Sequence, residues 1–277
     1  MKVQDLLNQT DKLPNVPDVV RELIQLFNDP NANYSDIASR VVYDQTISLK
    51  VLRMVNSAYF GLSRKISSID EAVVLLGMEK LKTLVIASGF ANSVSKVDGL
   101  KLNDFWMDSF RVAELAQWFA KRTPLVSEDE AFTAGIVHNI GRLLLHLAQP
   151  SLAIEIQTLV ANRKMGRVKA ERDLLGFTSQ EAGKALMDLW KFPPQLGLAV
   201  QEHKHPFGDG SDEPQALACV LNLACYINAC IAHERDSDLV REGFPGAVGK
   251  AAGLPESIIY ELDDALIIEG AFDQLLG

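Results

Sequence analysis

Apolar residues recur at intervals of three and four positions along most of this chain of 277 residues, and no run of strict apolar–polar alternation stands out. This spacing places apolar side chains on one face of an α-helix. The clearest segments with the pattern are residues 16–27, 47–58, 78–95, 105–122, 127–147, 178–192 and 214–233. The pattern therefore predicts an all-α fold. The unusually apolar segment 214–233 is expected to lie centrally in its part of that fold.

Three capping boxes indicate where helices begin. In this motif a Ser or Thr and a Glu three positions later satisfy each other's free backbone N–H groups in the first helical turn. The three are Ser68-x-x-Glu71, Ser127-x-x-Glu130 and Thr178-x-x-Glu181. We expect the second to open one continuous helix that runs to about Leu147. That helix should stop at Gln149, because proline disfavours helical geometry in the residue before it.

The polar segment 96–99 contains a glycine and separates two groups of predicted helices. We therefore predict an N-terminal helical subdomain over residues 1–98 and a second helical subdomain over residues 99–277. The predicted helix 78–95 carries apolar residues around much of its circumference, so a broad apolar contact between the two subdomains is expected.

Composition narrows the class of protein to which the chain can belong. Hydrophobic residues make up 48% of the chain and charged residues 23%, which is typical of a globular protein. No apolar run reaches the roughly 18 residues of a membrane-spanning helix, and the N-terminus has no basic start leading into an apolar stretch. We therefore expect a cytoplasmic protein without membrane contact.

Nucleic acid is disfavoured as a partner. The formal net charge is −9, whereas binding phosphates requires clustered Lys and Arg side chains. One small basic cluster exists and is typical of a solvated helix face. It consists of Arg163, Lys164, Arg167, Lys169 and Arg172.

Among the five histidines, His138 is the most informative. It forms a polar pair with Asn139 inside a helical segment that is otherwise apolar. Burying an imidazole beside a carboxamide costs free energy unless both find hydrogen-bond partners. Two interpretations stay open, a hydrogen-bonded pair in the core and a part of a functional site.

The other four histidines give weaker indications of a functional site. His203 and His205 lie two positions apart, which is about 200° of rotation on a helix, so both cannot face one ion. Because Pro206 follows, His205 is expected at a helix end. His146 and His233 are also expected at helix ends, the latter exposed to solvent near the negative end of a helix dipole.

Cysteine spacing does not match a metal site. Cys219, Cys225 and Cys230 are separated by six and five residues, which fits no zinc pattern. Reduced and mostly buried thiols are expected. No glycine-rich phosphate loop and no nucleophile elbow occurs in the sequence.

Several motifs follow one another in an order that resembles a known family. The most specific is Asn56-Ser57-Ala58-Tyr59-Phe60-Gly61. The others are Leu13-Pro14-Asn15-Val16-Pro17, residues 72–78, Phe105-Trp106, residues 134–142, Leu175-Gly176-Phe177 and Trp190-Lys191-Phe192-Pro193. Over about residues 10–235 the chain resembles the HDOD domain, the HD-related output domain of bacterial signalling proteins. The resemblance implies a multi-helical HD-like bundle related to the HD-superfamily phosphohydrolases, which hold one or two divalent metals with His and Asp ligands.

The resemblance also implies where those metal ligands would fall. A first ligand histidine corresponds to Asp108, the His-Asp pair to His138 and Asn139, two further histidines to Ser179 and His203, and a late aspartate to Cys225. Only the two histidines, His138 and His203, keep the expected residue type.

The changed residue types argue against catalysis. The amide of Asn139 carries no charge to offset a dication, and the thiol of Cys225 is a soft ligand among hard donors. We therefore expect no bound metal, no cofactor and no enzymatic activity. Two outcomes are open for the pocket among the six positions: a polar cavity that binds a ligand, or a space filled by side-chain packing.

The resemblance implies a non-catalytic signal-transduction or regulatory module. Such a module would bind a protein partner in a bacterial signalling pathway, or a small ligand such as a nucleotide. Two alternatives remain. One is a metal-dependent phosphohydrolase in which Asp108, His138 and His203 hold one ion, and the other is a nucleotide-binding sensor without hydrolysis.

Overall fold

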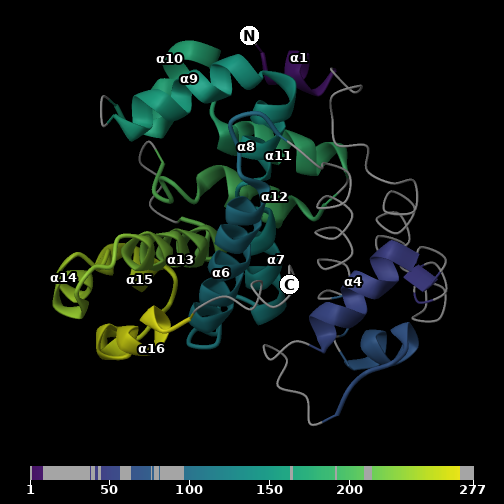
Figure 1. Ribbon diagram of the computed structural model, residues 1–277. Coiled ribbons are helices and arrows are strands. Elements are labelled where there is room, and N and C mark those ends of the chain that lie inside the picture. Colours follow the sequence, from purple (N-terminus) through teal and green to yellow (C-terminus); the bar gives the residue numbers. More distant parts are fainter. Residues whose placement is uncertain are drawn as a thin grey trace.

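The computed structural model describes residues 2–8, 38, 41–42, 45–56, 64–75, 77, 81, 97–162, 165–190, 192–208 and 214–268. Within these ranges the chain forms helices joined by turns, with one isolated bridge between Val97 and Leu100 and no strand. The predicted all-α fold is confirmed (Figure 1). None of the helices in these ranges is both long and apolar enough to cross a bilayer.

Within the described ranges, most helices lie after residue 97, and residues 69–75 add a short helical segment near α4 (Figure 1). The labelled elements are α1 (Val3–Leu7), α4 (Gln45–Val55), α6 (Leu102–Ala120), α7 (Glu128–Val137), α8 (Ile140–Ala148), α9 (Pro150–Ala161), α10 (Arg167–Leu175), α11 (Ser179–Leu189), α12 (Pro194–Glu202), α13 (Ala216–Ala232), α14 (Ser237–Glu242), α15 (Gly246–Ala251), the 3-10 helix η3 (Glu256–Tyr260) and α16 (Leu262–Leu266).

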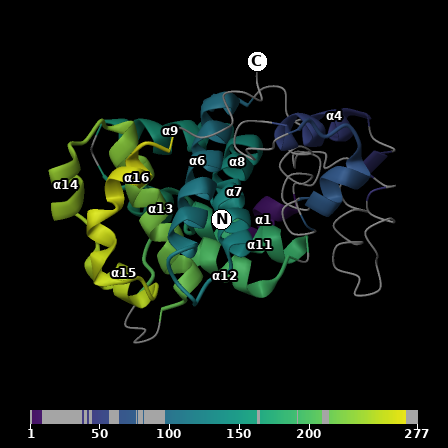
Figure 2. The ribbon, with the colours of Figure 1, turned by 90° about the horizontal axis from the view of Figure 1, so that it is seen from below.

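Helices α6 and α13 form the centre of the described fold. Helix α6 packs along α7 and α13, and α13 also contacts α7, α12 and α15. On the other side of α12, α11 packs against α8, and α9 lies against both α8 and α10. The large buried side chains of α6, among them Trp106, Phe110 and Phe119, fill the space between these helices. The predicted central position of segment 214–233 is confirmed. Seen from below, α14, α15 and α16 lie on the opposite side of α6 from α4 (Figure 2).

The three predicted capping boxes differ in outcome. At α11 the box is complete, because the Glu181 N–H donates to Thr178 Oγ1 at 3.2 Å and the Thr178 N–H donates to Glu181 Oε2 at 2.7 Å. Ser68 Oγ accepts from the Glu71 N–H at 3.2 Å. Helix α7 begins directly after Ser127, but the Ser127 side chain makes no capping hydrogen bond. The predicted boundary is right there and the predicted capping box is wrong.

The continuous helix predicted over 127–147 is also wrong. The structure divides it into α7 and α8, with a turn at His138 and Asn139. Asn139 leaves helical geometry (φ −102°, ψ 8°), and its carbonyl accepts from the N–H groups of Arg142 and Leu143, so that a new helix begins. Its side chain donates to Asp108 on α6. Asparagine is favoured at such helix starts, and here a tertiary hydrogen bond also holds its side chain.

The predicted segments 16–27 and 78–95, apart from Leu81, lie outside the described residues, as do residues 13–17 and 57–61 of the family motifs. Asn56, the first residue of the most specific motif, is described. Its amide donates to the Ile66 carbonyl at 2.7 Å and accepts from the Ile66 N–H at 2.7 Å, which holds the end of α4 against residue 66. The first helix, α1, packs on α11 in the second half of the chain.

Candidate functional site

Four elements bring the candidate residues together. Asp108 lies on α6, His138 and Asn139 lie in the turn between α7 and α8, His203 ends α12, and Cys225 lies on α13. These residues meet because α13 packs on α6, α7 and α12, and α6 packs on α7. Five of the six predicted positions therefore form one cluster.

Two glycines allow the backbone on either side of His138 and Asn139 to approach its neighbours closely. A Cβ at Gly135 would overlap the Cα of Ala113 on α6 and lie 2.7 Å from its nitrogen. A Cβ at Gly141 would overlap the carbonyl oxygen of Ser179 on α11. Only glycine permits both contacts at once, and these contacts position the His138–Asn139 turn between α6 and α11.

The two histidines face each other in a fixed orientation. His138 and His203 are 3% and 0% exposed, and their ring centroids lie 5.8 Å apart in an edge-to-face arrangement. Nδ1 of His138 donates to the Gly135 carbonyl at 2.6 Å, and Nδ1 of His203 donates to the Val200 carbonyl at 2.7 Å. A carbonyl only accepts, so each Nδ1 carries a proton and each Nε2 is left for other partners.

Cys225 interacts with both rings. Although burial opposes ionisation, the nearby charges of Lys204 and His138, with hydrogen bonding from the two imidazoles, hold the pKa of the Cys225 thiol well below its ordinary value. Burial also disfavours the charged form of His138, but Cys225 and then Asp108 outweigh it and raise the pKa of His138. Burial lowers the pKa of His203. The pKa values of the two histidines are therefore shifted in opposite directions, although both rings are buried side by side.

The Asp108 carboxylate is held by two amides. Its Oδ1 accepts from Asn228 Nδ2 at 2.5 Å, and its Oδ2 accepts from Asn139 Nδ2 at 3.3 Å. Asn228 lies three residues after Cys225, on the same face of α13. Asn228 is a polar residue in a very apolar helix, one turn after the candidate position Cys225. That placement could have indicated from the sequence that Asn228 belongs to the site, but it was not among the predicted residues.

Ser179 does not join the cluster. Its N–H and Oγ donate to Glu171 Oε2 at 2.8 and 3.0 Å, and no hydrogen bond links it to the other five positions within the described chain. Glu171 on α10 is fully buried and forms an ion pair with Arg167 at 3.5 Å. The sequence contained the Arg167–Glu171 spacing of one helical turn, but nothing local indicated that Glu171 would be buried against Ser179.

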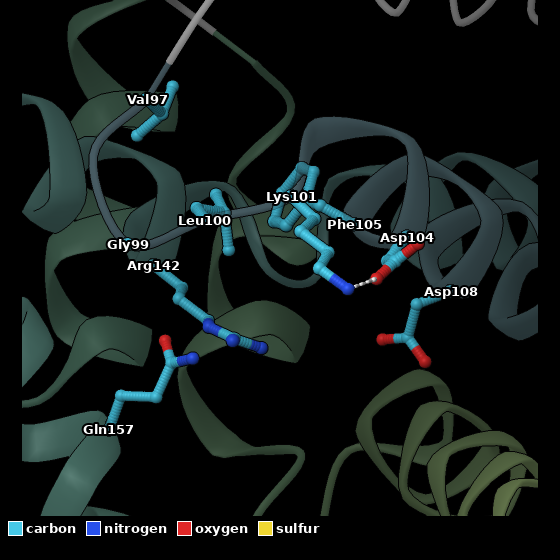
Figure 3. A pocket seen from close by; sticks show the side chains of 9 residues that line it. All are labelled: Val97, Gly99, Leu100, Lys101, Asp104, Phe105, Asp108, Arg142 and Gln157. Atoms are coloured by element: carbon cyan, nitrogen blue, oxygen red, sulfur yellow. Dashed lines mark ion pairs between the residues drawn. The ribbon is translucent and has the colours of Figure 1, made fainter.

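A cavity of about 740 Å³ opens beside Asp108 (Figure 3). Arg142 from α8 and Gln157 from α9 extend into it opposite Asp104 and Asp108 of α6. Burial, and then the charge of Arg167, lowers the pKa of Arg142. The Arg142 Nε and the Gln157 Oε1 are buried and make no hydrogen bond within the described residues. The remaining lining residues are Val97, Gly99, Leu100, Lys101 and Phe105.

The residues present do not fit a hydrolytic metal centre. Both oxygens of Asp108 accept from amide N–H groups, and the part of Asn139 that faces Asp108 is its NH₂ group, a donor that cannot bind a cation. Among the described residues no three His, Cys, Asp or Glu side chains are arranged to hold a metal ion. A hard dication would need the carboxylate that Asn139 lacks.

The other histidines and the cysteines were also assigned positions from the sequence, and the structure places them outside the candidate cluster, except for Cys225. His146, in the last turn of α8, is buried and its Nδ1 donates to the Asp98 carbonyl at 3.0 Å. His205 and His233 are exposed, and His233 ends α13, as predicted. All three cysteines are free thiols, with Cys219 and Cys230 buried and Cys225 partly buried.

The profile of the HDOD domain family matches residues 13–206. A crystal structure from Shewanella amazonensis SB2B, provisionally named a phosphohydrolase, is 33% identical, with a TM-score of 0.80 over 98% of this chain and 97% of that one. An HDOD domain protein of unknown function from Geobacter sulfurreducens is 23% identical, with a TM-score of 0.79 over 99% of this chain and 96% of that one.

A curated relative, an uncharacterized protein from Treponema pallidum (strain Nichols), is 24% identical over 222 residues. The aligned region is 79% of this chain but 42% of the Treponema protein. The chain therefore spans less than half the length of that relative.

Proposed function

This chain belongs to the HDOD domain family, and on that premise we propose that it is a non-catalytic regulatory module of bacterial signalling. It acts in the cytosol by binding a protein partner or a small ligand. The observation that supports the proposal is the Asp108–Asn139–Asn228 arrangement, in which two amides occupy both carboxylate oxygens beside the His138–His203 pair.

The chemistry of that arrangement opposes metal-dependent hydrolysis. A metal that activates water must displace the hydrogen bonds of Asp108 and still lacks the charged partner that an aspartate at position 139 would supply. The loss of a single outer-sphere partner already lowers metal affinity by about 10–100-fold. Here ligands that would contact the metal directly are replaced.

The cavity beside Asp108 is the proposed binding site for a small ligand. Its size falls within the range of about 300–1,000 Å³ for ligand sites. Arg142 and Gln157 contribute a buried donor and a buried acceptor without partners in the described chain. A ligand with an anionic group and a hydrogen-bond donor would satisfy both.

The first experiment tests catalysis. The full chain is loaded with Mn²⁺ or Mg²⁺, its metal content is measured by atomic emission, and phosphomonoesters and cyclic dinucleotides are assayed as substrates. We expect far less than one metal ion per chain and no turnover above that of His138→Ala. The control is His233→Ala, which changes an exposed histidine.

The rival function is a phosphohydrolase in which Asp108, His138 and His203 hold one ion, and it is favoured by the name of the Shewanella structure. One metal per chain, with turnover that is lost in His138→Ala and kept in His233→Ala, would establish this rival and reject our proposal.

Binding is tested separately. Calorimetry with mononucleotides and cyclic dinucleotides, without metal, measures saturable binding to the wild-type chain and to Arg142→Gln. Saturable binding without product, lost in Arg142→Gln, identifies a nucleotide sensor. If no nucleotide binds, the proposal requires a protein partner, which capture from the native cell with mass spectrometry would identify.

A further inference from the structure

The walls of the cavity beside Asp108 carry charges of both signs. Lys101 and Asp104 pair with each other at its outer edge, where Lys101 Nζ lies 3.9 Å from Asp104 Oδ2 and both side chains are mostly exposed. These two charges offset each other in contact with solvent. The other two charged lining residues are Arg142 of α8 and Asp108 of α6, which extend into the cavity from opposite walls (Figure 3).

Arg142 has no charged partner at its side of the cavity. Its Nε is buried and makes no hydrogen bond, and no ion pair joins its guanidinium to another described residue. The nearby Arg167 is itself paired with the buried Glu171 at 3.5 Å. Burial, and then the charge of Arg167, lower the pKa of Arg142, and the charge of Asp108 acts in the opposite direction. Arg142 and Asp108 therefore interact electrostatically, but the cavity separates them.

The Asp108 carboxylate can accept further hydrogen bonds. Each of its oxygens accepts one amide N–H, from Asn228 at 2.5 Å and from Asn139 at 3.3 Å. A carboxylate has roughly four acceptor positions, so about two stay open. Because the two amides are neutral, they orient the carboxylate without cancelling its charge.

Gln157 adds an acceptor to the wall that carries Arg142. Its Oε1 is buried and makes no hydrogen bond within the described residues, and its amide lies beside Arg142 (Figure 3). Val97, Leu100 and Phe105 add apolar surface to the same cavity. The walls therefore offer donors for an anionic group, acceptors for a cationic group, and an apolar surface for a side chain.

The balance of charge indicates which kind of small ligand fits. Two positive and two negative side chains line the cavity, so the lining has no net formal charge. A nucleotide would bring net negative charge without a matching excess of positive charge in the walls, and unmatched charge is costly away from water. A ligand without net charge, whose anionic and cationic groups are separated, would satisfy both Arg142 and Asp108.

We propose that the cavity binds an amino acid as a zwitterion between Arg142 and Asp108. The ligand carboxylate accepts from the Arg142 guanidinium, which can form two parallel hydrogen bonds with it. The ligand ammonium group has three donors, and it donates to Asp108, with Gln157 Oε1 as a second acceptor. The inference rests on the small-ligand form of the proposed function, and it adds a class of ligand that the nucleotide calorimetry does not sample.

The test is a binding screen of the full chain by thermal shift, followed by calorimetry on each compound that raises Tm. The compounds are the common α-amino acids, β-alanine and γ-aminobutyrate, each at about 10 mM, because a ligand that binds only the folded chain stabilises it. AMP and inorganic phosphate are the anionic references. We expect at least one amino acid to bind saturably and neither reference to bind.

Two derivatives of the amino acid that binds test the two ends of the cavity. Amidation removes the negative charge of the carboxylate, and N-acetylation removes the positive charge of the amino group. At about pH 6.5 the amino group of the amide is still mostly protonated. Each derivative should bind the wild-type chain at least about tenfold more weakly than the parent, because a charge-assisted hydrogen bond is lost.

Two variants assign these ends to residues. In Arg142→Gln the amino acid and its amide should bind alike, and in Asp108→Asn the amino acid and its N-acetyl derivative should bind alike. The control is Arg235→Gln, which changes an exposed arginine outside the cavity and should keep both preferences. Each variant is read as a ratio between two ligands, so a general loss of stability does not imitate the result. If Asp108→Asn fails to fold, the ratios in the wild type and in Arg142→Gln still decide.

Three results would overturn the inference. The first is that none of the amino acids binds. The second is that AMP or phosphate binds through Arg142 and no amino acid does, in which case the small-ligand form of the proposed function stands with an anion as the ligand. The third is an amino acid that binds Arg142→Gln and Asp108→Asn as tightly as the wild type, because it would then bind elsewhere. None of these results involves metal or turnover, so they are separate from a failure of the proposed function.

Discussion

Gly141→Ala tests the backbone contact that positions the candidate site. Gly141 lies in the first turn of α8, and an added Cβ would overlap the Ser179 carbonyl oxygen and lie 2.5 Å from the Gly183 nitrogen. Both neighbouring atoms belong to the backbone of α11 and cannot rotate away. Without that contact, alanine would stabilise a helix by up to about 1 kcal/mol over glycine.

The expected change in the free energy of unfolding follows from these two opposing effects. Forcing an extra group into a packed interior costs about 1–3 kcal/mol, and a contact with backbone belongs at the upper end. We expect Gly141→Ala to lower the free energy of unfolding by about 2–3 kcal/mol, which corresponds to a decrease of roughly 5–10 °C in Tm for a chain of this size.

Urea unfolding followed by circular dichroism measures this free energy. The control is Gly246→Ala at the start of α15, where an added Cβ meets no atom within 4 Å. That variant should be as stable as the wild type or more stable by up to about 1 kcal/mol. If Gly141→Ala unfolds within about 0.5 kcal/mol of the wild type, the close approach of α8 and α11 is wrong.

Three further predictions use the same measurement. Asp108→Ala leaves two amide donors without their acceptor and should cost about 1–3 kcal/mol, whereas Asp104→Ala, exposed on the same helix, should stay within about 0.5 kcal/mol of the wild type. Glu171→Gln removes a fully buried charge from its ion pair and should cost about 3 kcal/mol, against less than about 1 kcal/mol for the exposed Asp173→Asn. Burial lowers the pKa of His146, so the unfolded chain takes up a proton that the folded chain does not. The free energy of unfolding should therefore fall as the pH drops below about 6.5. His146→Gln should make that pH dependence shallower.

Each of these three predictions has a result that would contradict it. Equal costs for Asp108→Ala and Asp104→Ala would show that the amide hydrogen bonds do not form. A neutral Glu171→Gln would show that Glu171 is solvated in the protein. An unchanged pH dependence in His146→Gln would place the acid sensitivity in other groups.

Much of the helical content follows from local sequence patterns. Pro150 ends one helix and begins the next, the Thr178–Glu181 box starts α11, and the apolar stretch 214–233 becomes α13. These features depend on residues within about one turn of each other, and backbone geometry and capping act at that range. The family motifs similarly indicated which positions would meet.

The tertiary structure alone decided what those positions do. Asp108 takes its partners from residues 31 and 120 positions away, and Ser179 turns to Glu171 instead of the cluster. The break between α7 and α8 likewise depends on the hydrogen bond of Asn139 to α6 and on close backbone contacts at Gly135 and Gly141. Hydrogen bonds and burial at such separations depend on how helices pack, and periodicity along the chain describes only which face of each helix is buried.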